Sequence, residues 1–219
     1  MASSALGIVL GILVGLRHAF EPDHLSAVST LVGETHSVPH GALLGVLWGV
    51  GHTISLVVVG VILALVDATL PARAGVAFEL GVAVMLLLLG VRAIAAATRV
   101  PASHVPASHA HAPALPARRA RRVRWRPLVV GLVHGLAGSG ALTAIVFAQL
   151  PGSAARIAYM VLFGAGSIVG MAIASGLAGA TLQILARSGE VRRRIGLATG
   201  VVSIVVGLSW GIPLLAGYR

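Results

Sequence analysis

Two long apolar runs constrain the fold of this chain more than any other feature. Residues 41–66 read GALLGVLWGVGHTISLVVVGVILALV, and residues 75–91 read GVAFELGVAVMLLLLGV. A helix needs about 20 apolar residues to cross about 30 Å of hydrocarbon, and neither run shows the two-residue alternation of strands in a membrane barrel. Hydrophobic residues make up 57% of the chain, above the usual share in soluble domains. We therefore expect an all-α polytopic membrane protein.

Further apolar runs extend the expected fold to six transmembrane helices. The first run contains only 13 residues before Arg17, or about 20 Å of helix, so its span is expected to continue to about Val32. A signal peptide is the competing interpretation, but no positively charged segment precedes the run and no small-x-small cleavage site follows it. The six spans are expected at residues 4–32, 39–66, 75–97, 127–149, 156–186 and 194–216.

Arginine is distributed unevenly among the expected loops. Residues 99–126 and 187–194, two of these loops, are rich in Arg, whereas the other side of the membrane has only Arg73, Arg156 and Arg219. By the positive-inside rule, both Arg-rich loops are expected to be cytoplasmic and both termini are expected to be outside. The expected location is therefore a cytoplasmic membrane, the inner membrane of the cell.

The chain also repeats itself at a nearly constant spacing. GLRH at 15–18 returns as GLVH at 131–134, and LWGVGHT at 47–53 returns as LFGAGSI at 162–168. Each copy holds three spans, so the second copy must enter the membrane from the opposite side, as in the inverted repeats of secondary transporters. Chance similarity between Gly- and Leu-rich helices is the alternative. The expected units are a three-helix repeat at 1–98, a loop at 99–126 and a second three-helix repeat at 127–219.

Ionisable side chains are concentrated in RHAFEPDH, residues 17–24, near the middle of the first expected span. Such groups are costly at mid-membrane unless they pair or line a wet cavity, so their clustering indicates a functional site. On an ideal helix, Asp23 and His24 would point about 140° and about 240° away from His18. Because Pro22 cannot donate a hydrogen bond to the carbonyl group of His18, the first helix is expected to be broken near Pro22. The break would turn the three side chains toward one point.

Two imidazoles and a carboxylate without a nearby thiolate suit divalent nickel, cobalt, zinc or iron. We therefore predict a metal site formed by His18, Asp23 and His24, joined by His52 from the second span. A structural network in which Arg17 neutralises the acids is the alternative. Residues that could contribute are Arg17, Glu21, Thr53, His134, Ser139 and Thr143. Glu21 could be a ligand or only the partner of Arg17, and the second interpretation is favoured.

The second repeat lacks part of this donor set. His134 occupies the repeat position of His18, but Ser139 and Gly140 stand where Asp23 and His24 would recur. The site is therefore expected to be asymmetric.

The loop at 99–126 has a different character. Its near-duplicate PASH units and repeated prolines are typical of a disordered segment. His104, His109 and His111 could capture metal there, or they could be products of duplication within a linker.

Amino-acid types and motifs that the sequence lacks exclude several classes of function. The chain has no Cys, and all 16 of its basic residues are Arg, so thiolate metal sites and a Walker A loop are ruled out. The His-Glu-x-x-His string of metalloproteases does not occur, and we expect no enzymatic activity. The net charge of +10 is attributed to topology rather than to nucleic-acid binding, because the Arg residues lie beside apolar spans.

At RHAFEPDHLSAV the sequence resembles the nickel/cobalt transporter family, whose signature is a His followed after four residues by Asp-His. His18, Asp23 and His24 match this signature, and GHT at 51–53 is similar to the family's Gly-His-Ser/Thr step. Glu21-Pro22 stands where the family usually has Asp-Ala, and the later acidic signatures of the eight-helix permeases are missing. The chain is therefore more similar to the short six-span branch, which includes urease- and hydrogenase-associated nickel permeases and nickel/cobalt exporters.

The resemblance implies a secondary transporter that moves Ni²⁺ or Co²⁺ across the lipid bilayer and carries no prosthetic group. Uptake is favoured over export, because only the His-rich loop argues for export. The alternative is a non-transporting membrane accessory protein for urease or hydrogenase metal-centre assembly. A homo-oligomer is compatible with the sequence.

Overall fold

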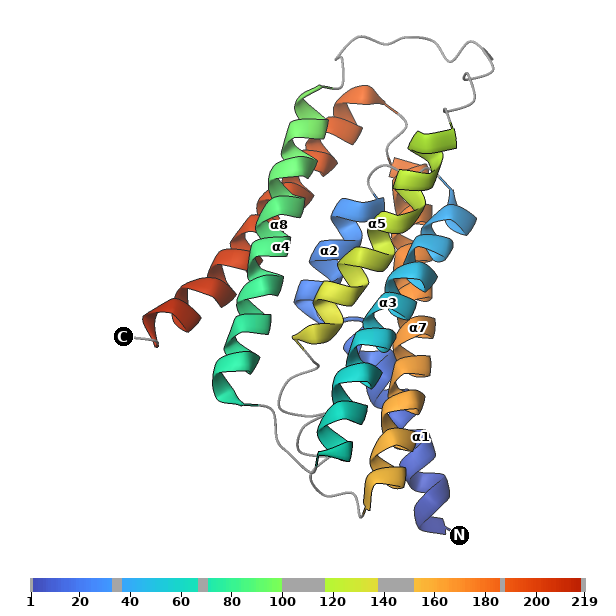
Figure 1. Ribbon diagram of the computed structural model, residues 1–219. Helices are drawn as coiled ribbons and strands as arrows, with labels where there is room; N and C mark the ends of the chain where they lie inside the picture. The colour runs from blue at the N-terminus through green and yellow to red at the C-terminus, as the bar shows by residue number, and fades with distance from the viewer. Residues whose placement is uncertain are drawn as a thin grey trace.

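The computed structural model describes residues 2–32, 37–66, 71–99, 117–137, 152–185 and 188–217. Every regular element in these ranges is an α-helix (Figure 1), which agrees with the expected all-α class. The helices are α1 (Ala2–His18), α2 (Pro22–Val32), α3 (Val38–Leu65), α4 (Ala72–Thr98), α5 (Ala117–Leu136), α7 (Gly152–Leu185) and α8 (Gly189–Ala216).

Four of the described helices, α3, α4, α7 and α8, are long and apolar enough to cross a membrane. Their bounds agree with four of the expected spans to within a few residues. In Figure 1, α1 occupies the lower part of the bundle and α2 the upper part, so together they cover the first expected span. α5 ends at Leu136, and the rest of the fourth expected span lies outside the described residues.

Pro22 separates α1 from α2, as the sequence predicts. α1 ends at His18, and the backbone N–H of Glu21 donates to the carbonyl oxygen of His18 at 3.0 Å, which closes a tight turn. Pro22 then takes the first position of α2, where its missing N–H costs no helical hydrogen bond. The break therefore uses local geometry that Pro tolerates well.

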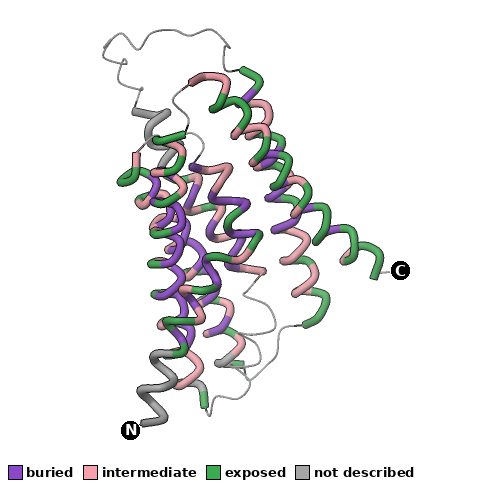
Figure 2. Tube along the Cα trace, turned by 180° about the vertical axis from the view of Figure 1, so that it is seen from behind, coloured by how far each residue is buried: buried purple, intermediate pink, exposed green. Residues whose placement is uncertain are grey.

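α3 lies at the centre of the packing, because it contacts both α5 and α7, while α1 packs against α7 and α4 against α8. Figure 2 shows buried positions concentrated along these central helices. Glycine permits the closest approaches: a methyl group at Gly15 would overlap the carbonyl oxygen of Phe163, and one at Gly131 would overlap that of Trp48. Close backbone approach of this kind holds membrane helices together where water provides no hydrophobic drive.

The structure differs from the sequence-based expectation at the end of the Arg-rich loop. Residues 117–126, which we expected to be disordered, form the first half of α5. Ala and Arg both favour helix strongly, and this stretch contains neither Pro nor Gly. Residues 100–116 lie outside the described residues.

We expect Gly90→Ala to lower the thermal stability of the protein and Gly81→Ala, on the same helix, to leave it unchanged or raise it. An added methyl group at Gly90 would lie 2.6 Å from the carbonyl oxygen of Gly200 on α8, whereas no atom of the described residues lies within 4 Å of one at Gly81. Overpacking of this kind costs about 1–3 kcal/mol, while Ala gains about 0.5–1 kcal/mol over Gly inside a helix. Thermal unfolding in detergent measures both variants. Equal thermal midpoints for the two variants would contradict the close contact between α4 and α8.

Candidate metal centre

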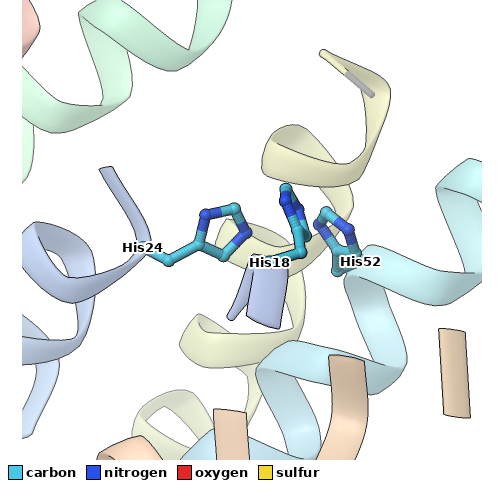
Figure 3. A group of neighbouring side chains, drawn as sticks. All are labelled: His18, His24 and His52. Carbon is cyan, nitrogen blue, oxygen red and sulfur yellow. The ribbon is translucent and has the colours of Figure 1, made fainter. Parts of the chain in front are cut away.

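Five polar residues meet in the interior of the bundle, each at most 4% exposed. They come from the end of α1, the start of α2, the middle of α3 and the last turn of α5. Figure 3 shows three of the imidazole rings gathered at one place, with the ring of one pointing toward the other two. The five residues are His18, Asp23, His24, His52 and His134.

Two helices direct their carboxyl ends at this cluster. In Figure 1, α1 rises from one end of the bundle and α5 descends from the other, and both stop near its middle. His18 is the last residue of α1, and His134 lies in the last turn of α5. Because the carboxyl end of a helix carries a partial negative charge, both helices favour a cation where they meet.

Several buried ring nitrogens in the cluster have no hydrogen-bond partner within the described part of the chain. They include Nε2 of His18, Nε2 of His24 and both ring nitrogens of His52. One donor atom from each of these three residues lies within 4.8 Å of the others. A buried polar atom without a partner is costly, and one metal ion could satisfy a nitrogen of each ring at once.

Asp23 supplies the negative charge of the cluster. Nε2 of His134 donates a hydrogen bond to Oδ2 of Asp23 at 2.7 Å, and Nδ1 of His24 lies 3.1 Å from Oδ1. Because a carboxylate can only accept, His24 turns its Nδ1–H toward Asp23, which leaves Nε2 with the lone pair. Carboxylates commonly fix the tautomer and orientation of metal-binding His residues in this way.

Aromatic rings enclose the cluster. The indole ring of Trp48 is stacked on the imidazole of His24 with a centroid distance of 5.4 Å, and it lies 5.7 Å from the ring of His134. The ring of Phe163 lies 5.3 Å from that of His18. Trp48 and Phe163 are both buried, so their rings limit the motion of the imidazoles and the access of water.

Sequence reasoning did not single out Trp48 or Phe163. The signal was present in the repeated segments LWGVGHT and LFGAGSI, where an aromatic residue stands one helical turn before His52 or Ser167. A comparison of the repeats at their aromatic positions as well as their His positions would have identified both aromatic residues.

The structure brings together the four residues that the sequence assigns to a metal site and His134, which the sequence offers as a possible contributor from the second half. Glu21 lies at the edge, with its carboxylate 3.0 Å from Nδ1 of His18 and its side chain 42% exposed. We expected Glu21 to pair with Arg17, which is exposed instead. The turn after His18 removes the helical i,i+4 spacing that such a pair requires.

The remaining candidates lie away from the cluster or outside the described residues. The hydroxyl group of Thr53 donates to the carbonyl oxygen of Gly164 at 3.2 Å, so it joins α3 to α7. Five predicted residues lie outside the described ranges, and their roles stay predictions: Ser139, Thr143, His104, His109 and His111.

Comparison with known proteins finds relatives along nearly the whole chain. It is 29% identical to the urease accessory protein UreH from Bacillus sp. (strain TB-90) over 204 residues, which cover 93% of this chain and 89% of that protein. It is 26% and 23% identical to the chloroplast proteins FOR GROWTH AND FERTILITY 1 and 2 of Arabidopsis thaliana. Those alignments cover 93% and 95% of this chain but only 58% and 56% of the plant proteins.

No family model matches the chain, and no solved structure matches it. The similarity to UreH fits the nickel/cobalt permease-like family in general and does not distinguish among its branches.

Proposed function

We propose that the protein is a secondary transporter of divalent transition-metal cations, with nickel and cobalt as the favoured substrates. The observation that carries the proposal is the group of buried imidazole nitrogens with no hydrogen-bond partner among the described residues, beside a buried carboxylate, at the break between α1 and α2. Imidazole and carboxylate donors without sulfur suit Ni²⁺ and Co²⁺. Secondary transporters bind their substrates at such broken helices, near the middle of the bilayer.

The name of one relative supports nickel as the substrate. Urease is a nickel enzyme, and the urease accessory protein UreH is similar to this chain over 93% of its length. A transporter that supplies a nickel enzyme inside the cell would bring the metal inward. Uptake is therefore the favoured direction.

Corresponding contacts support an arrangement of six spans in two inverted repeats, with α1 and α2 as one broken span and α5 opening the second repeat. The contact between Gly15 and Phe163 has a counterpart at the repeat-related positions Gly131 and Trp48. The contact between Gly51 and Leu128 likewise has a counterpart between Gly166 and Ile12. A two-fold axis that exchanges the halves produces such pairs. Rocking of one half against the other would open the site alternately to the two sides.

We place the chain in the cytoplasmic membrane, with the loops at 99–126 and 187–194 inside and both termini outside. In Figure 1, α4 ends and α5 and α8 begin at one end of the bundle, while the N-terminus lies at the other. The Arg residues of these two loops therefore gather on one side, as the positive-inside rule requires of a cytoplasmic face.

A non-transporting membrane partner in metal-centre assembly is the second candidate function. The word accessory in the name of UreH favours it. Such a partner would bind Ni²⁺ at the same cluster without moving it across the membrane, so flux separates the two functions.

Ni²⁺ uptake into proteoliposomes tests the proposal. We expect the purified protein to move Ni²⁺, and His52→Ala to lower the rate at least tenfold, about the range seen when groups around a metal are removed. His40→Ala is the matched control, because His40 lies on the same helix but is exposed and contacts Ser37. Binding without flux in the unaltered protein would favour the accessory role. Equal uptake rates for the two variants would show that His52 is not part of the site.

A further inference from the structure

The candidate ligands form two overlapping sets of three rather than one set of five. The first set is His18, His24 and His52, and the second is Asp23, His24 and His134. Within each set, one donor atom per residue lies within 4.8 Å of the others. The ring centroids of His52 and His134 are 6.0 Å apart, whereas that of His24 is 4.0 Å from His134 and 4.2 Å from His18. His24 is the residue that both sets share.

The two sets differ in the part of the molecule that supplies them. The first set comes entirely from α1, α2 and α3, before the 99–126 loop. The second takes His134 from α5, after the loop, and the 2.7 Å hydrogen bond from His134 to Asp23 joins the two halves directly. The sets also differ in charge, because the first offers only imidazoles and the second includes a carboxylate.

His134 has a nitrogen available for a ligand bond. Its Nε2 donates to Asp23, so the lone pair is on Nδ1. Nδ1 is buried and has no hydrogen-bond partner within the described part of the chain. His134 can therefore bind an ion through Nδ1 without moving a proton, but Asp23 faces the other side of the ring and has to release its hydrogen bond from Nε2 before it binds the same ion.

A single ion can use only one of the two sets fully at a time. The shared lone pair on Nε2 of His24 binds one ion, and two doubly charged ions this close would repel strongly in a buried environment. The sets are therefore successive positions for one ion and not a binuclear centre.

We propose that Asp23, His24 and His134 form a second position for the transported ion, reached from the position formed by His18, His24 and His52. The inference rests on the proposed transport function. During the transfer, the bonds to His18 and His52 break and Asp23 releases the N–H groups of His24 and His134. Bonds from the ion to Asp23 and to Nδ1 of His134 then form, while Nε2 of His24 stays bound. The second position joins α2 to α5, whereas the first takes its ligands from α1, α2 and α3, so a change in the contact between α2 and α5 makes or breaks the second position without removing a ligand from the first.

The experiment compares binding with movement in the full-length protein carrying His134→Gln. Gln keeps a donor for Asp23 but lacks the imidazole, and His134→Phe serves as a second variant that keeps a ring. We expect Co²⁺ to bind both variants with an affinity within about fivefold of the unaltered protein, because the first position remains. Ni²⁺ flux should fall at least about 30-fold. The visible absorption of bound Co²⁺ should change to that of the all-imidazole position alone.

Ser55→Ala is the matched control, since Ser55 donates to the carbonyl oxygen of Leu132 at 2.7 Å across the same pair of helices and belongs to neither set. It should retain normal flux. Normal flux in both His134 variants, or Co²⁺ affinity lost as fully as when His24 is replaced, would overturn the inference. If the unaltered protein moves no Ni²⁺, transport itself fails. The second position then depends on the Co²⁺ spectrum, and identical spectra with and without His134 would overturn it.

Discussion

His24→Phe is expected to abolish metal binding and transport together. His24 is fully buried and is the residue common to both groups of candidate ligands, so its loss removes a donor whichever group holds the ion. Phe keeps a flat ring against Trp48 but has no nitrogen. Asp23 retains its hydrogen bond from His134, so the bundle should still fold. We expect at least a 100-fold loss of affinity, about 2.7 kcal/mol.

Trp48 provides a direct readout of binding at this position. Its indole ring is stacked on His24, so an open-shell ion such as Co²⁺ beside that imidazole should quench its fluorescence. The other two Trp residues, Trp125 and Trp210, are exposed and can be changed to Phe so that Trp48 is the single emitter. In that background, Co²⁺ should quench the emission, and His24→Phe should remove the response.

The matched control applies the same substitution to His40, which is exposed near the start of α3. His40→Phe should leave quenching and flux intact. A His24→Phe protein that still responds to Co²⁺ and still moves Ni²⁺ would show that the cluster is a structural network and that the ion binds elsewhere.

The break between α1 and α2 could be predicted because its causes are local. The length of the apolar run before Arg17 and the missing N–H of Pro22 both belong to one short segment, and the structure confirms that α1 ends at His18 and α2 begins at Pro22. The same break explains why the expected Arg17–Glu21 pair does not form. That expectation assumed helical spacing across the very residues where the helix stops.

The contact between His134 and Asp23 could not be derived from the sequence, because it depends on how two distant helices pack. The repeat placed His134 at the position of His18 but gave no information on which face of α5 turns inward. That face is set by Gly131 and Gly135, where a methyl group would overlap the carbonyl oxygens of Trp48 and His52. α5 therefore lies directly against the part of α3 that carries His52, and His134 points into the cluster.

The expectation of disorder at residues 117–126 was wrong because it was drawn from the composition of the whole loop. The prolines and PASH units that suggest disorder all precede this stretch, whereas its own Ala and Arg residues favour helix. A boundary placed by the last proline before the Arg run would have matched the start of α5.

Asp23→Asn is expected to stop transport without weakening the fold, and this combination separates a metal site from a structural network. Asn has nearly the same shape: its oxygen can accept the N–H of His134, and its amide group can donate to Nδ1 of His24 once that ring takes the other tautomer. Removal of a buried charge spares its desolvation, so the thermal midpoint without metal should stay the same or rise. In a network whose stability depends on the charge, the same change should cost about 3–5 kcal/mol.

The effect of Asp23→Asn on metal follows from charge. At about 4 Å and an effective dielectric constant of about 20, each pair of unit charges contributes about 4 kcal/mol, and the ion carries two. Even a third of the Coulomb energy summed over both charges of the ion corresponds to about a 100-fold loss of affinity. We therefore expect saturating Ni²⁺ to raise the midpoint of the unaltered protein and to leave that of Asp23→Asn unchanged. Glu190→Gln makes the same acid-to-amide change in an exposed pair with Arg194 and should behave as the unaltered protein. A lowered midpoint without metal together with normal Ni²⁺ flux would assign Asp23 to the architecture of the bundle, because its charge would then stabilise the helices and not the ion.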